Sequence, residues 1–238
     1  MPIQELKSSA RQRMHELAPR LFLISTLYVI LSSVLGNLQV RIIGTGAIFN
    51  RIIERLGEGE MFTLYLIISN IRITTVLIAA LIGIFSFVLG VGFMSFCLRT
   101  ARKQETDYSD IFEGFSIFVK AVLLYLLTSL FIFLWSLLLI IPGVIAQYRY
   151  RQAYYILLDA PEKSIMQCIN ESKVLMDGAK LDLFMLDVSF LAWILLNMLV
   201  ILFLPLPFSL PIVLLYLAPY QGITRAKFYE TLVKRLVV

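Results

Sequence analysis

The chain has 238 residues, of which 59% are hydrophobic and only 16% are charged. A water-soluble domain with so few charges would leave large apolar patches on its surface, so the composition excludes an ordinary soluble protein. The formal net charge of +5 does not indicate a nucleic-acid-binding protein either. Its Lys and Arg residues stand at the ends of apolar blocks, where they meet lipid head groups and orient membrane spans.

The apolar residues form blocks of roughly 18 residues or more, a length typical of transmembrane helices. Membrane β-barrels instead alternate polar and apolar residues in segments of about ten. We therefore predict an all-α, polytopic membrane helix bundle, a single integral membrane domain over residues 1–238, with amphipathic surface helices in addition. We expect about six transmembrane helices: 21–40, 73–98, 119–141, 143–158, 183–204 and 207–222.

Residues 1–20 repeat apolar side chains at helical spacing beside basic ones. This pattern predicts a short amphipathic helix at the membrane surface, although a solvated leader to the first span fits equally well. The block at 21–40 is longer than the apolar core of a signal peptide, and no small-x-small cleavage motif follows it. We expect it to stay attached as an anchor.

Residues 41–60 contain glycine breaks around an amphipathic piece, which we interpret as an interfacial segment on the outer side. Residues 61–98 would extend roughly 55–60 Å as one helix, against about 30 Å of hydrocarbon. Asn70 and Arg72 mark an interface, so the crossing is expected to begin at Ile73. Small residues within this crossing form one face that lets a neighbouring helix approach closely: Ala79, Gly83, Ser86 and Gly90.

A polar connection over residues 99–118 leads to the span 119–141, which we expect to turn at Pro142 and Gly143. The next segment, 143–158, is long enough to cross a bilayer, at about 25 Å as a helix. It nevertheless carries two arginines and four tyrosines. We interpret it as a short, polar fourth span that faces other helices, and a surface helix is the alternative.

Asp159 is predicted to cap the next helix, with Pro161 in its first turn and Glu162 at the capping-box position. Gly178 is expected to end this helix, which we place on the cytoplasmic surface. Its apolar face consists of Ile165, Cys168, Ile169, Ser172, Leu175 and Met176. The last two spans follow and are joined by a tight turn at residues 205–207.

Charged residues inside predicted spans give the candidate site. An ionised group in hydrocarbon costs on the order of 2.5–3.5 kcal/mol and normally finds a partner. We predict that Asp187 pairs with Arg149 or Arg151, with Tyr148 and Tyr150 nearby. These five residues form a candidate intramembrane binding cluster, and a purely structural ion pair is the other interpretation.

Metal and cofactor sites are not expected. His15 is the only histidine, and the only two cysteines, Cys97 and Cys168, are far apart in the sequence. Transition-metal sites normally need clustered histidines or thiolates. We expect both thiols to be reduced and packed in the fold.

Several motifs point to a known family: Glu5–Ala10, Asp110–Phe115, Phe133–Gly143, Tyr148–Tyr150, Tyr155–Asp159, Glu171–Gly178 and Leu186–Trp193. Together they span nearly the whole chain and resemble the bacterial membrane family called domain of unknown function 975. The helix ending in Pro142-Gly143, with its following surface helix, is more distantly similar to the membrane domain of some glycerophosphodiester phosphodiesterases. The catalytic barrel of those enzymes has no counterpart here. The resemblance implies a six-helix protein of the bacterial plasma membrane without an assigned activity.

No nucleophile elbow, glycine-rich phosphate loop or metal-ligand cluster stands out in the sequence, so we do not expect an enzyme. The leading interpretation is a non-catalytic membrane protein with an accessory, binding or protective role. Its expected partners are the lipid bilayer, anionic lipid head groups and another membrane protein, without nucleic acid. A small-solute transporter or channel is the first alternative, and an intramembrane enzyme that acts on lipid is the second.

The positions of basic residues near span ends predict that both termini are cytoplasmic. A reporter fused after Val238 should therefore read cytoplasmic. A single cysteine placed near Glu58 should react with a membrane-impermeant reagent added to intact cells. Labelling near Glu58 only after permeabilisation would contradict this orientation.

Overall fold

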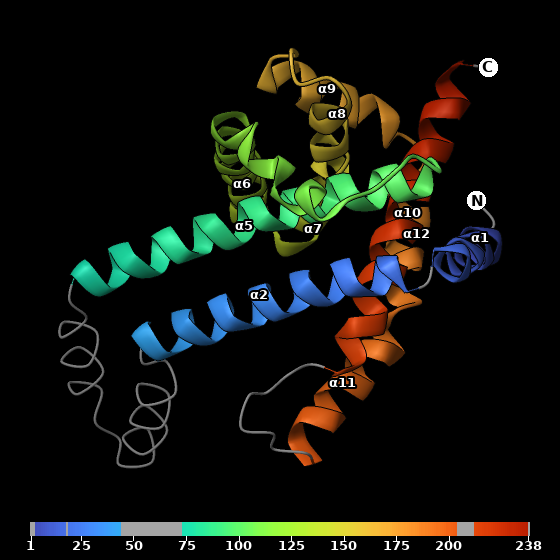
Figure 1. Cartoon of the computed structure of the whole chain (residues 1–238). Coiled ribbons are helices and arrows are strands. Elements are labelled where there is room, and N and C mark those ends of the chain that lie inside the picture. The colour runs from blue at the N-terminus through green and yellow to red at the C-terminus, as the bar shows by residue number, and fades with distance from the viewer. Residues whose placement is uncertain (1–2, 18, 44–72, 204–211, 238) are drawn as a thin grey trace. The chain divides into compact units, whose positions relative to one another are not determined.

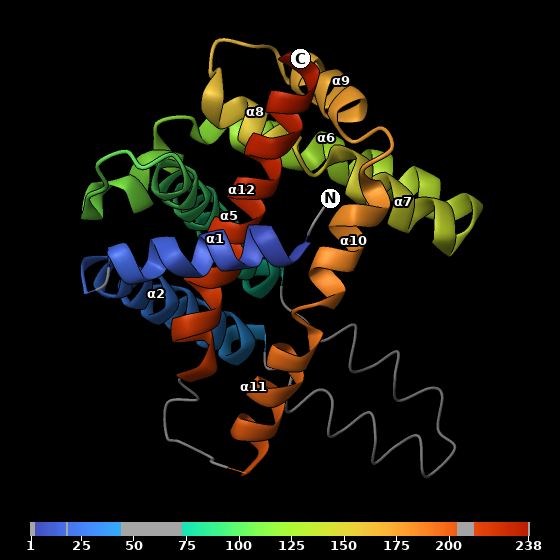
Figure 2. The ribbon, with the colours of Figure 1, turned by 90° about the vertical axis from the view of Figure 1, so that its right-hand side faces the viewer.

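The computed structural model describes residues 3–17, 19–43, 73–203 and 212–237, and these residues form helices without any β-strand among them (Figures 1 and 2). The all-α fold class is thereby confirmed. The predicted interfacial segments between residues 44 and 72 and the turn at 205–207 lie outside the described residues. In chain order the elements are α1 (Ile3–Glu16), α2 (Arg20–Ile43), α5 (Ile73–Ala101), the 3-10 helix η1 (Tyr108–Phe115), α6 (Phe118–Leu138), α7 (Ile140–Tyr150), α8 (Ala153–Asp159), α9 (Ile165–Leu175), α10 (Lys180–Val188), α11 (Leu191–Phe203) and α12 (Ile212–Val237).

Four helical stretches in the described part of the chain have the length and composition to cross a membrane: Arg20–Ile42, Ile73–Ala101, Phe118–Leu138 and Lys180–Val200. They overlap four of the six predicted spans. Few of their side chains are buried within the chain, and in Phe118–Leu138 the buried share of the most apolar window is 17%. Such extensive apolar exteriors suggest a membrane protein, because in water they would form unusually large exposed patches.

The chain divides into two compact units, and the boundaries between them along the sequence fall within α2 and within α5. Residues Ile30–Phe87 form the small unit, and the rest of the chain forms the large unit. In the small unit the side-chain amide of Gln39 donates to the carbonyl of Ala79 at 3.3 Å. A Cβ atom on Gly83 would lie 3.3 Å from the same amide nitrogen. Ala79 and Gly83, two members of the predicted small-residue face, therefore lie against a neighbouring helix. The prediction of a single domain over the whole chain stays a prediction.

In the large unit, α6 and α7 form a helical hairpin that turns at Leu139, whose backbone is extended. The prediction of a turn at Pro142 and Gly143 is wrong by three residues. Pro142 lies in the first turn of α7, where its missing N–H breaks no helical hydrogen bond. A Cβ on Gly143 would lie 2.0 Å from the Oγ of Ser136 on α6. The glycine thus permits close packing of the hairpin rather than the turn itself.

The predicted fourth span, 143–158, is not one helix. It is divided between α7 and α8 by a turn at Arg151 and Gln152. The amide of Arg151 donates to the carbonyl of Tyr148, three residues back, at 3.5 Å. Such three-residue bonds tighten the chain locally and interrupt the α-helix. Neither α7 nor α8 alone reaches the length of about 20 residues that a membrane crossing requires.

Asp159 does not cap the next helix, contrary to the prediction. It ends α8, and its carboxylate accepts hydrogen bonds from Arg102 and Tyr229. The cap of α9 is Ser164, whose hydroxyl accepts from the Gln167 amide at 3.3 Å while the Gln167 side chain accepts from the Ser164 amide at 2.8 Å. This reciprocal pair is a capping box. The capping pattern in the local sequence gave a wrong prediction because the carboxylate of Asp159 binds residues far away in the chain.

The helix α9 otherwise follows the sequence analysis. It buries much of the predicted apolar face: Cys168, Ile169, Ser172 and Met176. Past its end, Gly178 has a φ of +70°, a left-handed conformation that glycine adopts readily. The helix itself ends at Leu175, three residues before the predicted end, and Gly178 lies in the turn that follows.

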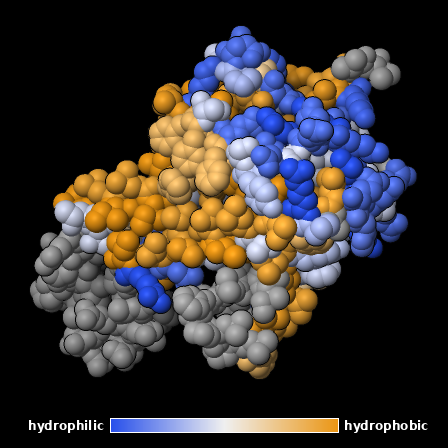
Figure 3. Space-filling view, viewed as in Figure 1, coloured by the Kyte–Doolittle hydropathy of each residue, from blue (hydrophilic) through white to orange (hydrophobic). Residues whose placement is uncertain are grey.

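The helix α1 packs against α12 (Figure 2). It buries Leu6, Ala10 and Met14 within the chain. The predicted amphipathic helix at the membrane surface stays a prediction. The ammonium of Lys7 donates to the carbonyl of Ser189 at 3.0 Å, which joins α1 to the turn between α10 and α11. On the side seen in Figure 3, hydrophilic residues gather around α1, α9 and the segment after α5.

The helix η1 contacts α5 backbone to backbone. A Cβ on Gly92 would lie 1.8 Å from the carbonyl oxygen of Ile111, and one on Gly114 would lie 2.3 Å from that of Val88. Arg99 at the end of α5 reinforces this contact with ion pairs to η1. The predicted polar connection over residues 99–118 is therefore folded back onto α5.

Replacement of Gly92 by Ala should lower the free energy of unfolding of the large unit by about 1–3 kcal/mol, the usual cost of overpacking. The new Cβ would meet the backbone of Ile111, which has no flexible end to move aside. Thermal unfolding of the purified full chain measures the loss. Gly36→Ala is the matched control, because its Cβ would meet nothing within 4 Å. Equal loss in both variants would contradict the proposed contact.

Candidate functional site

The candidate site lies in the large unit, where side chains from α7, α10 and α12 converge. Each helix buries apolar residues beside its polar member: Ala146 and Tyr150 near the end of α7, Leu183 and Leu186 on α10, and Ile223 and Ala226 on α12. The polar side chains therefore lie at the rim of a packed apolar region. We call Tyr148, Arg151, Asp187 and Arg225 the Asp187 cluster.

Both carboxylate oxygens of Asp187 accept hydrogen bonds. Oδ2 accepts from Nη1 of Arg151 at 2.5 Å and from the hydroxyl of Tyr148 at 3.3 Å. Oδ1 accepts from Nη2 and Nε of Arg225, at 2.9 Å and 3.2 Å. Asp187 thus bridges two guanidinium groups that belong to different helices, and the three helices are connected through one side chain.

The cluster carries two positive charges and one negative charge. Burial lowers the pKa of the Arg225 guanidinium, the positive charge of Arg151 lowers it further, and the Asp187 carboxylate opposes both effects. An arginine nevertheless stays protonated under physiological conditions. The cluster therefore keeps an excess of one positive charge. The side chains of Arg151 and Arg225 are each 28% exposed, so this charge reaches the surface of the chain.

The structure brings together three of the five residues that the sequence singled out. Tyr148, Arg151 and Asp187 meet, but Arg149 and Tyr150 do not join them. Tyr148 lies in the last turn of α7 and Arg151 directly follows the helix, three residues on, so both side chains reach the same carboxylate. The ring of Tyr150 is buried, with its centroid 5.9 Å from that of Phe131 on α6.

Arg225 is the member that the sequence analysis missed. In the sequence Arg225 stands out only as one of the basic residues of the C-terminal region. The structure shows that Arg225 lies between Thr224 and Ala226, both buried, in a stretch that also buries Ile223 and Phe228. A charged residue inside such a stretch needs a partner in the fold.

A second network joins the ends of α5, α8 and α12. Arg102 donates to both carboxylate oxygens of Asp159, at 2.6 Å and 2.7 Å, and to Glu230 at 2.6 Å. The hydroxyl of Tyr229 also donates to Asp159, at 2.8 Å. Here one guanidinium is matched by two carboxylates. The hydrogen bonds to Asp159 raise the pKa of Arg102. The pKa of Tyr229 is also raised, mainly by burial and to a smaller extent by its hydrogen bond to Asp159.

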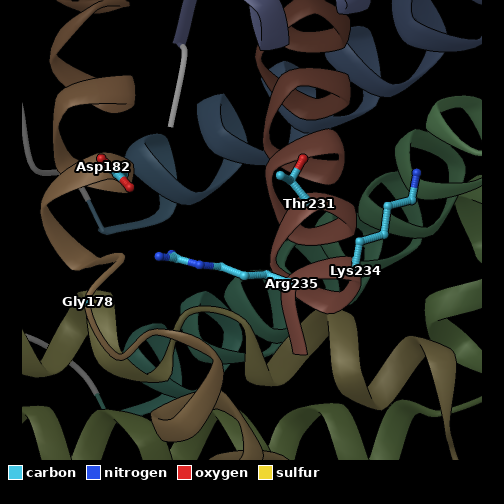
Figure 4. A pocket seen from close by; sticks show the side chains of 5 residues that line it. All are labelled: Gly178, Asp182, Thr231, Lys234 and Arg235. Carbon is cyan, nitrogen blue, oxygen red and sulfur yellow. The ribbon is translucent and has the colours of Figure 1, made fainter. Parts of the chain in front are cut away.

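An open groove of about 510 Å³ lies between α10 and α12, lined by Gly178, Asp182, Thr231, Lys234 and Arg235 (Figure 4). The side chain of Arg235 extends into the space between the two helices, and Asp182 faces the same space from α10. None of the residues in the Asp187 cluster lines this groove. Its basic residues are exposed and lie near the end of α12, as positively charged flanks of membrane helices commonly do.

Within the described residues, no three His, Cys, Asp or Glu side chains are grouped closely enough to hold a metal ion. Cys97 and Cys168 are both buried free thiols. The candidate site therefore rests on arginine, aspartate and tyrosine side chains. Their chemistry is that of hydrogen bonding and charge.

Replacement of Asp187 by Ala should destabilise the full chain by about 1–3 kcal/mol, because both arginines lose their carboxylate at once. Thermal unfolding in detergent measures the effect. Asp182→Ala removes the same charge from the same helix without breaking the bridge, and it should cost less. A double-mutant cycle of Asp187→Asn with Arg225→Gln should give non-additive losses. Additive losses, or a larger effect at Asp182, would contradict the bridge.

Comparison with known proteins finds one family that resembles part of the chain. A family model described as "Protein of unknown function (DUF975)" matches residues 137–236. The match runs from the end of α6 to the end of α12 and includes every residue of the Asp187 cluster. No curated protein and no solved structure matches the chain. The resemblance seen in the sequence motifs is thus confirmed over residues 137–236, which are similar to the DUF975 family, a family of unknown function.

Proposed function

We propose that this protein is a multi-pass protein of the bacterial plasma membrane, with both termini cytoplasmic, that has a non-catalytic binding or accessory role. The observation that carries the proposal is the Asp187 cluster, in which one carboxylate holds two partly exposed guanidinium groups. Side chains fixed by several hydrogen bonds are preorganised to hold a ligand or partner without rearrangement.

The geometry of the cluster favours binding over catalysis. A carboxylate that acts as a general base needs an oxygen that is available to take a proton. Both oxygens of Asp187 already accept hydrogen bonds, three of them from guanidinium nitrogens. The two arginines cannot act as acids, because they do not lose their protons in proteins. What this cluster offers is a fixed positive charge and directed N–H donors.

The expected partners are the lipid bilayer, its anionic head groups and another membrane protein. Large exposed apolar side chains support the first of these. Around the tip of the α6–α7 hairpin, Leu138, Leu139, Ile140 and Ile141 are all at least 68% exposed. An apolar tip of this kind is suited to contact with lipid tails or with the apolar surface of a membrane partner.

A small-solute transporter is the second candidate, and one observation favours it. The turn between α7 and α8 contains Gln152, which is 2% exposed. Its Oε1 atom has no hydrogen-bond partner among the described residues. Interrupted helices with polar groups at the break are typical of substrate sites in transporters.

Reconstitution of the full chain separates the two candidates. For a binding or accessory protein, proteoliposomes should show no more ion or solute flux than protein-free vesicles. Gentle extraction from native membranes should recover a bound lipid or protein, and Arg225→Gln should reduce that recovery while Arg149→Gln does not. Flux that rises with the amount of protein and falls with Gln152→Ala would favour the transporter and overturn the first candidate.

A further inference from the structure

The Asp187 cluster holds more hydrogen-bond donors than its carboxylate can use. An arginine side chain has five N–H groups. Arg151 gives one of them to Asp187, and Arg225 gives two. The described residues supply no acceptor for the other side-chain N–H groups, four on Arg151 and three on Arg225. Donors on two partly exposed guanidinium groups, which share one carboxylate, are therefore available to a ligand.

The excess positive charge of the Asp187 cluster favours an anionic ligand, as its unused N–H donors do. Asp187 belongs to the stretch Lys180–Val200, which is apolar enough to cross a membrane. Lys7 from α1 reaches the carbonyl of Ser189, two residues after Asp187. An unbalanced positive charge at the edge of hydrocarbon is costly and is normally neutralised by a partner. Asp187 is the only carboxylate among the described residues that pairs with either arginine.

The second network does not share this surplus. Arg102 is matched by the carboxylates of Asp159 and Glu230, with which it forms two ion pairs. That network has more acceptors than positive charges and has no need of an external anion. The Asp187 cluster has the reverse composition.

We infer that Arg151 and Arg225 form a binding site for the phosphate group of a phosphate ester, with Asp187 holding the two guanidinium groups in place. This inference rests on the proposed binding role and names its ligand class. A tetrahedral phosphate offers several oxygens, so it accepts from two guanidinium groups at once. One further negative charge balances the cluster. The ester is either a phospholipid head group or a soluble phosphate compound.

The test is a titration of the detergent-solubilised full chain with phosphatidylglycerol, with bound lipid counted by native mass spectrometry. Arg151→Gln and Arg225→Gln should each weaken binding about tenfold, the effect of losing roughly 1.4 kcal/mol of charge-assisted hydrogen bonding. Arg149→Gln is the matched control, since it removes the same charge from the same helix outside the cluster. It should leave the affinity unchanged, and phosphatidylcholine, whose head group is neutral overall, should bind more weakly than phosphatidylglycerol.

Asp187→Asn keeps the test decisive if the arginine variants do not fold. This variant keeps one side-chain oxygen that accepts from a guanidinium group, and it removes the negative charge that competes with phosphate, so its affinity for phosphatidylglycerol should rise. Phosphatidylglycerol should also raise its thermal unfolding temperature more than that of the wild type. Equal affinities in the wild type, Arg225→Gln and Arg149→Gln, or weaker binding by Asp187→Asn, would overturn the inference.

Inorganic phosphate distinguishes the two sources. If inorganic phosphate displaces the lipid, the site recognises the phosphate group itself and also accepts soluble phosphate esters. Lipid binding that phosphate does not displace, and that still depends on Arg225, assigns the site to a phospholipid head group. A ligand recovered from native membranes that lacks phosphate would overturn the phosphate site and leave the binding role intact. Protein-dependent solute flux with the same arginine dependence would instead overturn the binding role and keep the phosphate site.

Discussion

The carboxylate of Asp187 lies between two guanidinium groups, and the arrangement of α7, α10 and α12 depends on that bridge. Each oxygen serves a different arginine, so the side chain fixes two helices relative to its own. Hydrogen bonds between charged groups are stronger than those between neutral ones, and more so where water is scarce. The same scarcity makes either arginine costly to leave unpaired, so the bridge constrains both helices.

Two polar networks of opposite composition connect the helices of the large unit. The Arg102 network sets one guanidinium against two carboxylates, whereas the Asp187 cluster sets two guanidinium groups against one carboxylate. The first joins the ends of α5, α8 and α12 and satisfies its own positive charge. The Asp187 cluster keeps one positive charge that no carboxylate balances and guanidinium N–H donors that have no acceptor among the described residues. This difference is the physical basis for assigning binding to one network and helix docking to the other.

Close backbone contact at glycines complements these polar bridges. Gly92 and Gly114 let η1 lie directly on α5, and Gly143 lets α7 approach Ser136 on α6. Helices in a bilayer gain little from the hydrophobic effect between them, so tight van der Waals contact and interhelical hydrogen bonds become the main sources of stability. The apolar side chains are then left to face outward, as they do along α6.

The sequence by itself determined the helical class, the four long apolar stretches that overlap four of its six predicted spans, and the pairing of an arginine near the end of α7 with Asp187. Each follows from local composition, or from the rule that a charge in an apolar segment needs a partner. Only the tertiary structure decided that Arg225 shares this carboxylate, that Asp159 serves Arg102 instead of capping α9, and that the predicted fourth span breaks at Arg151 and Gln152. These outcomes depend on which residues distant in the chain come within hydrogen-bonding distance. Periodicity and capping patterns report only on neighbours along the chain, so they do not contain that information.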